Sequence, residues 1–425
     1  MNVLKELFKH EVYPALGCTE PIAVAYTASL AANELEGELE EITIFTDPGV
    51  YKNGMAVTVP NTNGERGNLI AGVLGAIIRK PESKMEILKH ADQEMINQSK
   101  AYIESGKAKI ILDKDKKDLY IEVRLKTLHG YSRAVVEHAH MNLVYLEANN
   151  RVIFEKKTSV EDSSNQAYRS ILQEMTILEM IDLVDHLDDE DKAYIKLGIE
   201  MNLEISKVGQ NLNKVGYYIH DLTNKGFIHD DIFSSSKIMT ASASDARMSG
   251  VNLPVMTSGN SGNQGIVAVL VPYNVGKYYQ IDEGKIVQSI ALSHLVNSYV
   301  KCFIGDLSPL CGASISAGVG AAVAIVYQQC GGDNGKITYA VNTLISDLGG
   351  MLCDGAKAGC ALKVATSTDS AIRAAYMAIN NQGITDKEGF VGKSAEETIY
   401  HLSRIGKIGM GKADETMLEI MMGKN

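Results

Sequence analysis

Two cysteines enclose the strongest chemical motif in the sequence. Cys353 and Cys360 are the first and last residues of the segment Cys-Asp-Gly-Ala-Lys-Ala-Gly-Cys. On an unbroken helix, residues at this spacing lie about 10 Å apart along the axis, too far to bind one compact metal centre. Gly355 and Gly359 can supply the necessary break, because glycine adopts backbone conformations that other residues avoid. The segment therefore indicates two metal-binding thiolates or, as the alternative, two buried cysteines on a helix of small residues.

Cys311 is the third candidate ligand. It follows a Ser-Pro-Leu segment at a predicted junction between a loop and a helix. Three thiolates on turns and helix ends can hold an iron–sulfur cluster and leave one iron without a protein ligand. An open position makes a bound metal a Lewis acid that can bind a substrate. Zinc on the same thiolates is the rival, whereas Cys302 and Cys330 lie in apolar helical runs and are expected in the core.

Cys18 lies in a different setting, the segment Pro-Ala-Leu-Gly-Cys-Thr-Glu-Pro that ends at Pro21. Proline is tolerated in the first turn of a helix, so Cys18 is expected at or just before a helix N-terminus. Free backbone N–H groups and the positive end of the helix dipole lower a thiol pKa there. We expect a Cys18 thiolate that acts as base or nucleophile; a capping turn in which Cys18 only packs is the alternative.

A glycine-rich loop, Ser-Gly-Asn-Ser-Gly-Asn-Gln-Gly, spans Ser258 to Gly265 and leads into an apolar run. Glycine-rich turns that open a helix expose N–H groups able to bind phosphate or carboxylate. The loop lacks the Lys-Ser/Thr pair of a P-loop, and its glycine spacing differs from that of a dinucleotide-binding fingerprint. It therefore indicates a carboxylate-binding loop, with a plain helix-packing turn as the alternative.

The elements that must position these motifs follow from the hydrophobic patterns. The sequence predicts an α+β fold: an N-terminal helical segment over residues 1–40 that packs on the C-terminal body, an α+β subdomain over 41–160, and a mainly helical catalytic domain over 161–425. The polar stretch 156–166 is a predicted linker. His138 and His140 alternate along a predicted strand and are expected on one side of a sheet, as surface or core residues. Predicted strands cover residues 42–45, 55–59, 109–112, 119–123, 134–137, 143–146 and 152–154, and predicted helices include 68–78, 84–105, 177–184, 195–208, 286–300, 315–328 and 337–348.

The composition of the 425-residue chain narrows the class of protein. Hydrophobic residues make up 45% and charged residues 22%, as in ordinary globular proteins. The formal charge of −11 argues against a nucleic-acid surface and against docking on anionic lipid. No run is long and apolar enough for a membrane span, and the N-terminus has no export signal pattern. We therefore expect a cytoplasmic protein whose cysteines serve metal binding or catalysis rather than disulfides.

Taken together, the three motifs resemble those of the L-cysteine desulfidases, which group with the serine-dehydratase-alpha-like proteins. The resemblance runs in order from Cys18 to Cys360 and covers most of the chain. It implies an oxygen-sensitive [4Fe–4S] cluster on Cys311, Cys353 and Cys360, which aerobic preparation can remove, and a catalytic thiolate at Cys18. The related iron–sulfur L-serine dehydratases have a wider second gap between their ligands and a different glycine-rich loop. The short gap in this sequence therefore favours a desulfidase.

The resemblance implies a carbon–sulfur lyase that converts L-cysteine to sulfide, ammonia and pyruvate by β-elimination, a reaction of cysteine catabolism. In this scheme Cys18 removes the α-proton and the open iron takes the leaving sulfur. The expected partner is the small amino-acid substrate, in a chain that allows a homo-oligomer and needs neither nucleic acid nor membrane. L-serine deamination and a non-catalytic metal- or redox-sensing role are the alternatives. The residues expected to bind and orient the substrate are Asn53, Arg247, Ser258, Gly259, Asn260, Ser261, Gly262 and Asn263.

Overall fold

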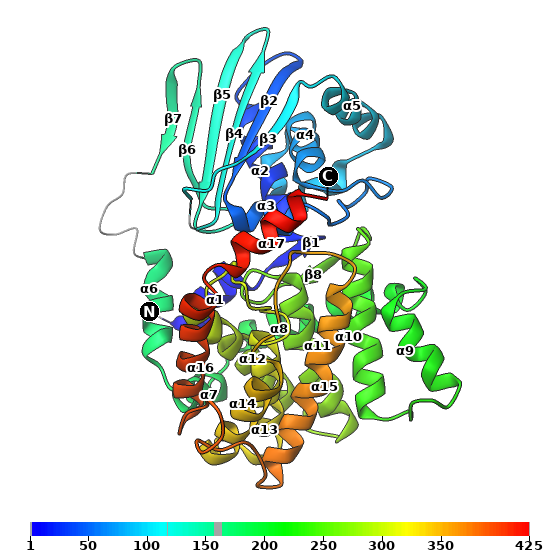
Figure 1. The fold of residues 1–425 in the computed structure, drawn as a ribbon, viewed down its shortest axis with the longest axis vertical. Helices are drawn as coiled ribbons and strands as arrows, with labels where there is room; N and C mark the ends of the chain where they lie inside the picture. Colours follow the sequence, from blue (N-terminus) through cyan, green and yellow to red (C-terminus); the bar gives the residue numbers. More distant parts are fainter. Residues whose placement is uncertain (1, 117, 157–163, 425) are drawn as a thin grey trace.

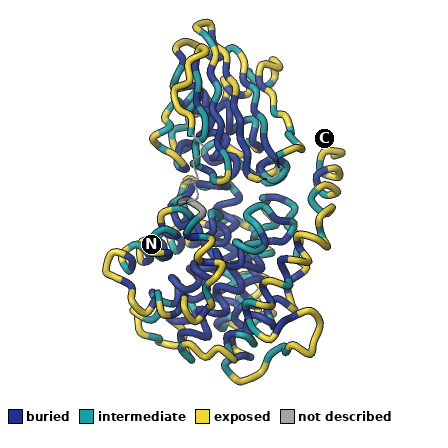
Figure 2. The backbone as a smooth tube through the Cα atoms, turned by 90° about the vertical axis from the view of Figure 1, so that its left-hand side faces the viewer, coloured by how far each residue is buried: buried dark blue, intermediate teal, exposed yellow. Residues whose placement is uncertain are grey.

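The computed structural model describes residues 2–116, 118–156 and 164–424. A sheet with its own helices forms one end of the molecule, and a larger group of helices forms the other (Figure 1). Buried backbone is concentrated inside each of these two parts, whereas the C-terminal helix runs along the outside (Figure 2). The predicted α+β fold is confirmed, with the sheet in the N-terminal half and a mainly helical region after it.

Six strands form one mixed sheet in the order β3-β2-β4-β5-β6-β7. β2 pairs in parallel with β3, and the other neighbours are antiparallel. Ile42 and Ile44 are buried and alternate with more exposed neighbours, as expected of a strand with one buried face. The strands are β2 (Leu39–Thr46), β3 (Ala108–Leu112), β4 (Tyr120–Thr127), β5 (Gly130–Glu137), β6 (Leu143–Ala148) and β7 (Arg151–Glu155).

Two helices cover the buried face of this sheet. α2 (Thr19–Asn33) and α4 (Asn68–Ile78) pack against each other and share an apolar core with the strands. Their backbones approach closely at Gly75, where a Cβ atom would lie 2.0 Å from the carbonyl oxygen of Ala25. Any larger residue would therefore push the two helices apart. The sheet part is completed by α3 (Pro48–Gly54), the 3-10 helix η1 (Pro81–His90) and α5 (Gln93–Glu104).

The helical part is built around α12 and α13, which bury side chains around almost their whole circumference. Small residues allow this packing, because a Cβ atom at Gly320 would lie 2.5 Å from the carbonyl oxygen of Ser293. The helices of this part and of the C-terminal segment are α1 (Val3–Glu11), α6 (Ser164–Glu174), α7 (Ile177–Asp185), α8 (Asp189–Gly209), α9 (Val215–Asn224), α10 (Ile232–Met248), α11 (Gly262–Tyr278), α12 (Glu283–Ile304), α13 (Ser316–Cys330), α14 (Asn334–Leu348), α15 (Cys360–Ile379), α16 (Ala395–Arg404), the π-helix η3 (Ile405–Gly409) and α17 (Ala413–Met422).

The two parts are joined at both ends of the chain. β1 (Pro14–Leu16) pairs antiparallel with β8 (Pro254–Met256). α1, before β1, packs on α6 and α12 of the helical part, whereas α2, after β1, packs on the sheet. α17 returns from the helical part and contacts α3. The chain therefore crosses between the parts within its first twenty residues, and the three-part division at residues 41 and 161 stays a prediction.

Most predicted elements are present, and the differences have local causes. Residues 55–59 form only an isolated bridge, Thr58 with Arg66. The helix predicted over 84–105 is divided, because Asp92 caps a new helix by accepting a hydrogen bond from the Met95 N–H group. The histidines at 138 and 140 lie in a turn after β5 rather than on a strand. The predicted linker 156–166 falls largely outside the described residues.

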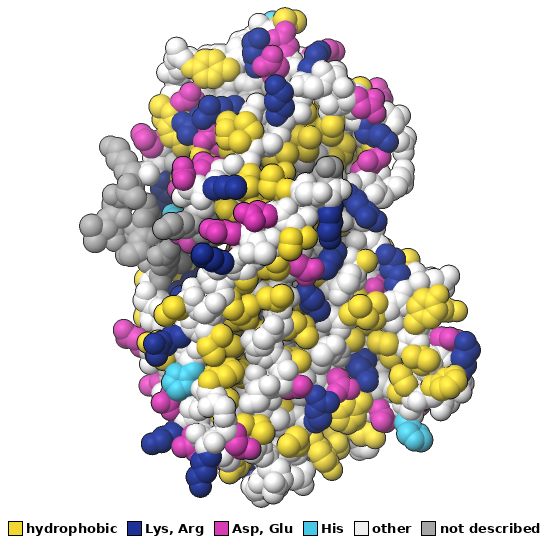
Figure 3. All heavy atoms as spheres, viewed as in Figure 1, with side chains coloured by type: hydrophobic (Ala, Val, Ile, Leu, Met, Phe, Trp, Pro, Cys, Tyr) yellow, Lys and Arg dark blue, Asp and Glu magenta, His cyan; other side chains and the backbone are white. Residues whose placement is uncertain are grey.

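Two observations concern the molecular surface and its surroundings. Acidic and basic side chains are interspersed over the face shown in Figure 3. Within the ranges that the structure describes, none of the helices combines the length and the apolar character that crossing a membrane requires.

Candidate active site

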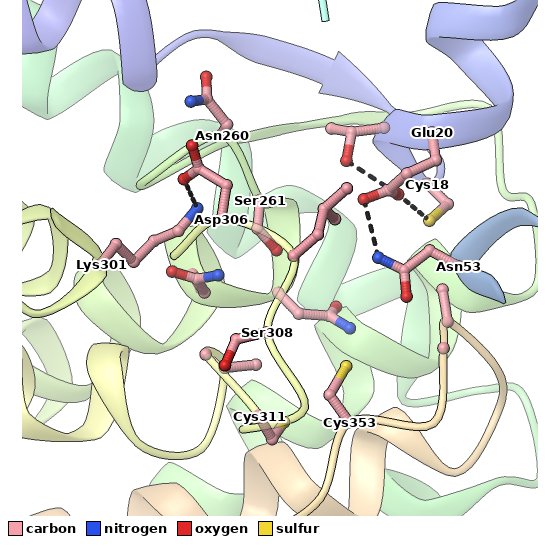
Figure 4. A pocket seen from close by; sticks show the side chains of 18 of the residues that line it. Cys18, Glu20, Asn53, Asn260, Ser261, Lys301, Asp306, Ser308, Cys311 and Cys353 are labelled. Atoms are coloured by element: carbon pink, nitrogen blue, oxygen red, sulfur yellow. Dashed lines mark hydrogen bonds and ion pairs between the residues drawn. The ribbon is translucent and has the colours of Figure 1, made fainter. Parts of the chain in front are cut away.

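A cavity of about 100 Å³ lies between the sheet part and the helical part. This volume has room for several water molecules or one small solute. The sheet part contributes the start of α2, α3 and the turn after β5, and the helical part contributes α10, the start of α11 and two loops. Figure 4 shows Cys18, Glu20 and Asn53 on one side, Asn260 and Ser261 across from them, and Cys311 with Cys353 below. The cavity thus brings together residues from both ends of the chain.

Cys311 and Cys353 lie on two short segments that pair like strands. The Cys311 N–H group donates to the Met351 carbonyl at 2.9 Å, and the Cys353 N–H group donates to the Pro309 carbonyl at 2.7 Å. Interaction with Cys353 lowers the pKa of Cys311 against the effect of burial, whereas interaction with Cys311 and burial raise the pKa of Cys353. Cys311 is therefore the more readily ionised of the two thiols.

Cys360 is the first residue of α15, and its thiol lines the same cavity. The break that the sequence requires between Cys353 and Cys360 occurs at Gly355, which has φ of +88°. Its Cα lies so close to α3 that a Cβ atom would be 2.4 Å from the Lys52 carbonyl oxygen. Gly359 has an ordinary φ of −63° and caps α15. Gly355 alone therefore supplies the left-handed conformation that turns the chain back toward the cavity.

These thiols can be compared with the requirements of a metal centre. All three line one cavity, and thiolates are the donors that iron–sulfur clusters use. Within the described ranges, no group of three or more His, Cys, Asp or Glu side chains is already arranged to hold a metal ion. The donor chemistry fits a cluster, but these side chains are not in a ligating arrangement, so the assignment of Cys311, Cys353 and Cys360 as its ligands stays a prediction.

Cys18 occupies the N-cap position of α2, as predicted, but its expected thiolate is not favoured. The residue is 3% exposed, and its thiol donates a hydrogen bond to Glu20 Oε2 at 2.9 Å. Burial, followed by the negative charge of Glu20, raises the pKa of Cys18 well above the ordinary thiol value, although Arg247 opposes this. The prediction of a lowered pKa is therefore wrong, because desolvation and an adjacent carboxylate outweigh the helix dipole.

Glu20 is the centre of a small network that the sequence reasoning missed. Its carboxylate accepts hydrogen bonds from Cys18, from the Thr19 hydroxyl at 3.2 Å, and from Asn53 Nδ2 at 3.2 Å. The His140 imidazole approaches to 3.9 Å from the turn after β5. Burial disfavours the charge, but His140 and the Cys18 thiol hold the pKa of Glu20 below its usual range. Glu20 lies two residues after Cys18 in the predicted motif, so the Cys-Thr-Glu sequence was the available signal.

Arg247 and residues of the glycine-rich loop also line the cavity. Arg247 is 2% exposed, and its Nε atom has no hydrogen-bond partner among the described residues. Gly262 leaves the space for this side chain, because a Cβ atom there would lie 2.2 Å from Arg247 Nε. Ser261 caps α11 without a side-chain hydrogen bond to the helix. Buried N–H donors of Arg247 and the start of α11 thus lie together, an arrangement suited to an anion.

The predicted substrate-binding residues divide into two groups. Those that line the cavity are Asn53, Arg247, Asn260, Ser261 and Asn263. The other three, Ser258, Gly259 and Gly262, are not among the lining residues and instead contact the side chains that surround the loop.

Ser258 is hydrogen-bonded to His294 and Asn297. The Gly259 carbonyl accepts a hydrogen bond from Lys301. Gly262, as described above, makes room for Arg247. Whether any of these residues binds substrate stays a prediction.

A second group missed by sequence reasoning is a buried ionic network at one edge of the cavity. Asp306 lies 2.7 Å from Lys301 and 2.7 Å from Arg169, and Arg169 lies 2.6 Å from Glu11. Burial opposes ionisation of Asp306, but the two cations lower its pKa far below the usual range. The network joins α1, α6 and α12 around the cavity wall, and its charges are already paired with one another.

Comparisons with known proteins place the chain in a family. The sequence model of the serine dehydratase alpha chain matches residues 82–419. A UPF0597 protein of Geobacter sulfurreducens is 58% identical over 424 residues, which cover 100% of this chain and 99% of that protein. A UPF0597 protein of Elusimicrobium minutum is 51% identical over 424 residues, which cover 100% of both chains. No solved structure matches the chain. The chain therefore belongs to the serine dehydratase alpha chain family.

Proposed function

We propose that this chain is a lyase that catalyses the iron–sulfur-dependent β-elimination of L-cysteine to sulfide, ammonia and pyruvate. The observation that carries the proposal is the convergence of two chemically different groups on one cavity. Three thiols, Cys311, Cys353 and Cys360, lie on one side, and a thiol–carboxylate pair, Cys18 with Glu20, lies on another. The first group has the donors of a cluster, and the second has the groups of an acid–base site.

Cys311, Cys353 and Cys360 are the residues that would hold a [4Fe–4S] cluster. Three thiolate ligands leave one iron without a protein ligand, and such a cluster supplies a Lewis acid for the leaving group. The paired backbones of the segments that carry Cys311 and Cys353, both of which line the cavity, support this assignment. Gly355 allows the third ligand to return to the same cavity.

The remaining chemistry belongs to side chains of the chain itself. Arg247 Nε and the N–H groups at the start of α11 bind the substrate carboxylate. Cys18 in its thiolate form removes the α-proton, and the positive charge of Arg247 favours that form against the effects of burial and of Glu20. The electron pair of the broken Cα–H bond forms the Cα=Cβ bond, and the Cβ–S bond breaks with its pair on sulfur. The aminoacrylate product hydrolyses in water to pyruvate and ammonia.

The test is an assay of protein reconstituted anaerobically with iron and sulfide. Wild-type protein should be brown and should release sulfide and pyruvate from L-cysteine. The Cys18→Ala variant should keep the cluster absorption and lose sulfide release, whereas Cys353→Ala should lose both. Cys302→Ala is the matched control, because this cysteine is not among the residues that line the cavity. Full activity in Cys18→Ala would remove the assigned base, and a colourless, zinc-containing protein would remove the cluster.

L-serine is the second candidate substrate, because the matching family model is that of the serine dehydratase alpha chain. The same assay with L-serine measures pyruvate without sulfide. The ratio of kcat/KM for the two amino acids decides between them. A ratio in favour of L-serine would leave the β-elimination in place and change the leaving group from sulfide to water.

A further inference from the structure

The cavity has hydrogen-bond donors at Arg247, where the substrate carboxylate is proposed to bind, and a separate group of acceptors around Glu20. Glu20 is 7% exposed and lines the cavity. A carboxylate offers about four acceptor positions, and Cys18, Thr19 and Asn53 occupy three of them. Acceptor capacity therefore remains on a buried anion that faces the cavity.

Two further acceptors adjoin Glu20. Asn53 donates through Nδ2 to Glu20, which leaves its Oδ1 atom buried with no hydrogen-bond partner in the described part of the chain. His140 is 6% exposed and lines the cavity, and neither ring nitrogen has a hydrogen-bond partner among the described residues, although Nε2 lies 3.9 Å from Glu20. In the neutral imidazole one of these nitrogens is an acceptor. Buried polar atoms normally have partners, so this group of three is incomplete without a donor.

We infer that Glu20, Asn53 and His140 form a receptor for the α-ammonium group of an amino acid. An ammonium has three N–H donors, which matches one carboxylate oxygen, one amide oxygen and one imidazole nitrogen. The other carboxylate that lines the cavity within the described residues, Asp306, is already paired with Lys301 and Arg169. Glu20 is therefore the cavity carboxylate that no lysine or arginine of the described residues pairs, with only the His140 imidazole 3.9 Å away.

This receptor deepens the proposed function, on which it rests, by fixing where the α-carbon lies. Glu20 accepts the hydrogen bond of Cys18, so an ammonium bound at Glu20 holds the adjacent Cα–H bond near the Cys18 sulfur. With the carboxylate at Arg247, the third substituent of the α-carbon points toward the thiols that lie below in Figure 4. Three fixed substituents select one enantiomer, and the substrate class is a free L-α-amino acid with an unmodified amino group.

Equilibrium binding of two small probes to the reconstituted protein tests the receptor. L-alanine has the ammonium and no leaving group, and L-lactate replaces the ammonium by a hydroxyl group. Anaerobic titration calorimetry should show L-alanine binding to wild-type protein more than about tenfold tighter than L-lactate, because a charged hydrogen bond is worth more than a neutral one. The Glu20→Gln variant should weaken L-alanine by about tenfold or more and leave L-lactate unchanged.

A second variant and a matched control complete the cycle. Asn53→Ala should also weaken L-alanine selectively, whereas His129→Gln, at a histidine that is not among the residues lining the cavity, should change neither probe. Equal weakening of both probes by Glu20→Gln and Asn53→Ala, or no selectivity in wild-type protein, would overturn the receptor. Selective L-alanine binding without sulfide release from L-cysteine would overturn the proposed reaction and leave the receptor standing. Sulfide release from L-cysteine without selective L-alanine binding would overturn the receptor and leave the proposed reaction standing.

Discussion

Lys52 donates a hydrogen bond to the carbonyl oxygen of Cys353, with 3.0 Å between Nζ and the oxygen. The same ammonium lies 2.6 Å from a carboxylate oxygen of Asp414, although Lys52 itself is only 2% exposed. One buried cation thus joins α3 of the sheet part, the loop of a candidate cluster ligand, and the C-terminal helix α17. The contact holds the two parts together directly beside the cavity.

Replacing Lys52 by methionine should destabilise the fold and the site together. The Cys353 carbonyl and the Asp414 carboxylate would each lose a buried donor, at a cost of about 1–3 kcal/mol in the free energy of unfolding. Asp414→Asn should cost less, because its carboxylate is one-third exposed and Lys52 keeps the Cys353 carbonyl. Urea unfolding of both variants measures the difference. An Asp414→Asn variant less stable than Lys52→Met would contradict the role given to the carbonyl contact.

Gly355→Ala should distort the segment between Cys353 and Cys360. The position has a positive φ, and a Cβ atom would meet the Lys52 carbonyl oxygen at 2.4 Å, so we expect a loss of stability of at least about 1 kcal/mol. Iron content after reconstitution should fall with it. Gly359→Ala is the matched control, because its φ is negative and the nearest atom to a Cβ would be the end of the Lys357 side chain at 3.6 Å. Equal iron content in both variants would argue against the turn at Gly355 as the device that positions Cys360.

Asp245 should make the stability of the wild-type protein depend on pH. Burial raises the pKa of Asp245 to about 6, so the folded state binds this proton more tightly than the unfolded state. The contribution is fully present below about pH 4 and is lost as the pH rises through 6, and it amounts to at most about 3 kcal/mol. Asp245→Asn keeps an acceptor for the Gly216 N–H group and removes the charge.

The Asp245→Asn variant should therefore gain stability over wild type at pH 7 and match it near pH 4. Denaturant unfolding of both proteins at pH 7 and at pH 4 measures how the stability difference between them changes with pH. A variant that is less stable than wild type at pH 7 would show that the ionised Asp245 carboxylate stabilises the folded state.

Arg247→Lys should impair catalysis without impairing the fold. The lysine ammonium cannot reproduce the planar guanidinium beside Gly262, so the substrate carboxylate loses a charged donor and kcat/KM should fall by about 10- to 100-fold. The measurement is initial sulfide release over a range of L-cysteine concentrations. Arg124→Lys, on the exposed face of β4, is the control and should leave kcat/KM unchanged. A fall in kcat/KM for Arg124→Lys without a fall for Arg247→Lys would contradict the assignment of Arg247 to the substrate carboxylate.

The sequence indicated the chemical motifs and most helices, but not the relations among them. Local rules were sufficient for the N-cap position of Cys18 and for the turn at Gly355, because helix starts and left-handed glycines depend on neighbouring residues. They failed for the Cys18 pKa, because burial in the folded protein and the negative charge of Glu20 raise it, and helix position alone does not reveal either effect. They also failed for His140. The sequence predicted a strand, in which alternation would set the direction of the side chain, whereas the residue lies in a turn that places its imidazole at the cavity.

The contacts of Lys52 were likewise beyond sequence reasoning. Its partners Cys353 and Asp414 lie hundreds of residues away, and a lysine between two predicted elements is usually a surface residue. Prediction of this site therefore required the fold, because the contacts of Glu20 with Asn53 and His140, and those of Lys52 with Cys353 and Asp414, join segments distant in sequence.

The placement of the cavity between the two parts has a consequence for how the protein is made. Cys18 and Glu20 leave the ribosome first, whereas Cys353, Cys360 and the helix that anchors Lys52 leave it last. The segments of the sheet are therefore complete while the loops of Cys353 and Cys360 are still untranslated. A cluster on the three proposed ligands can be completed only after Cys360 has been made, near the end of synthesis.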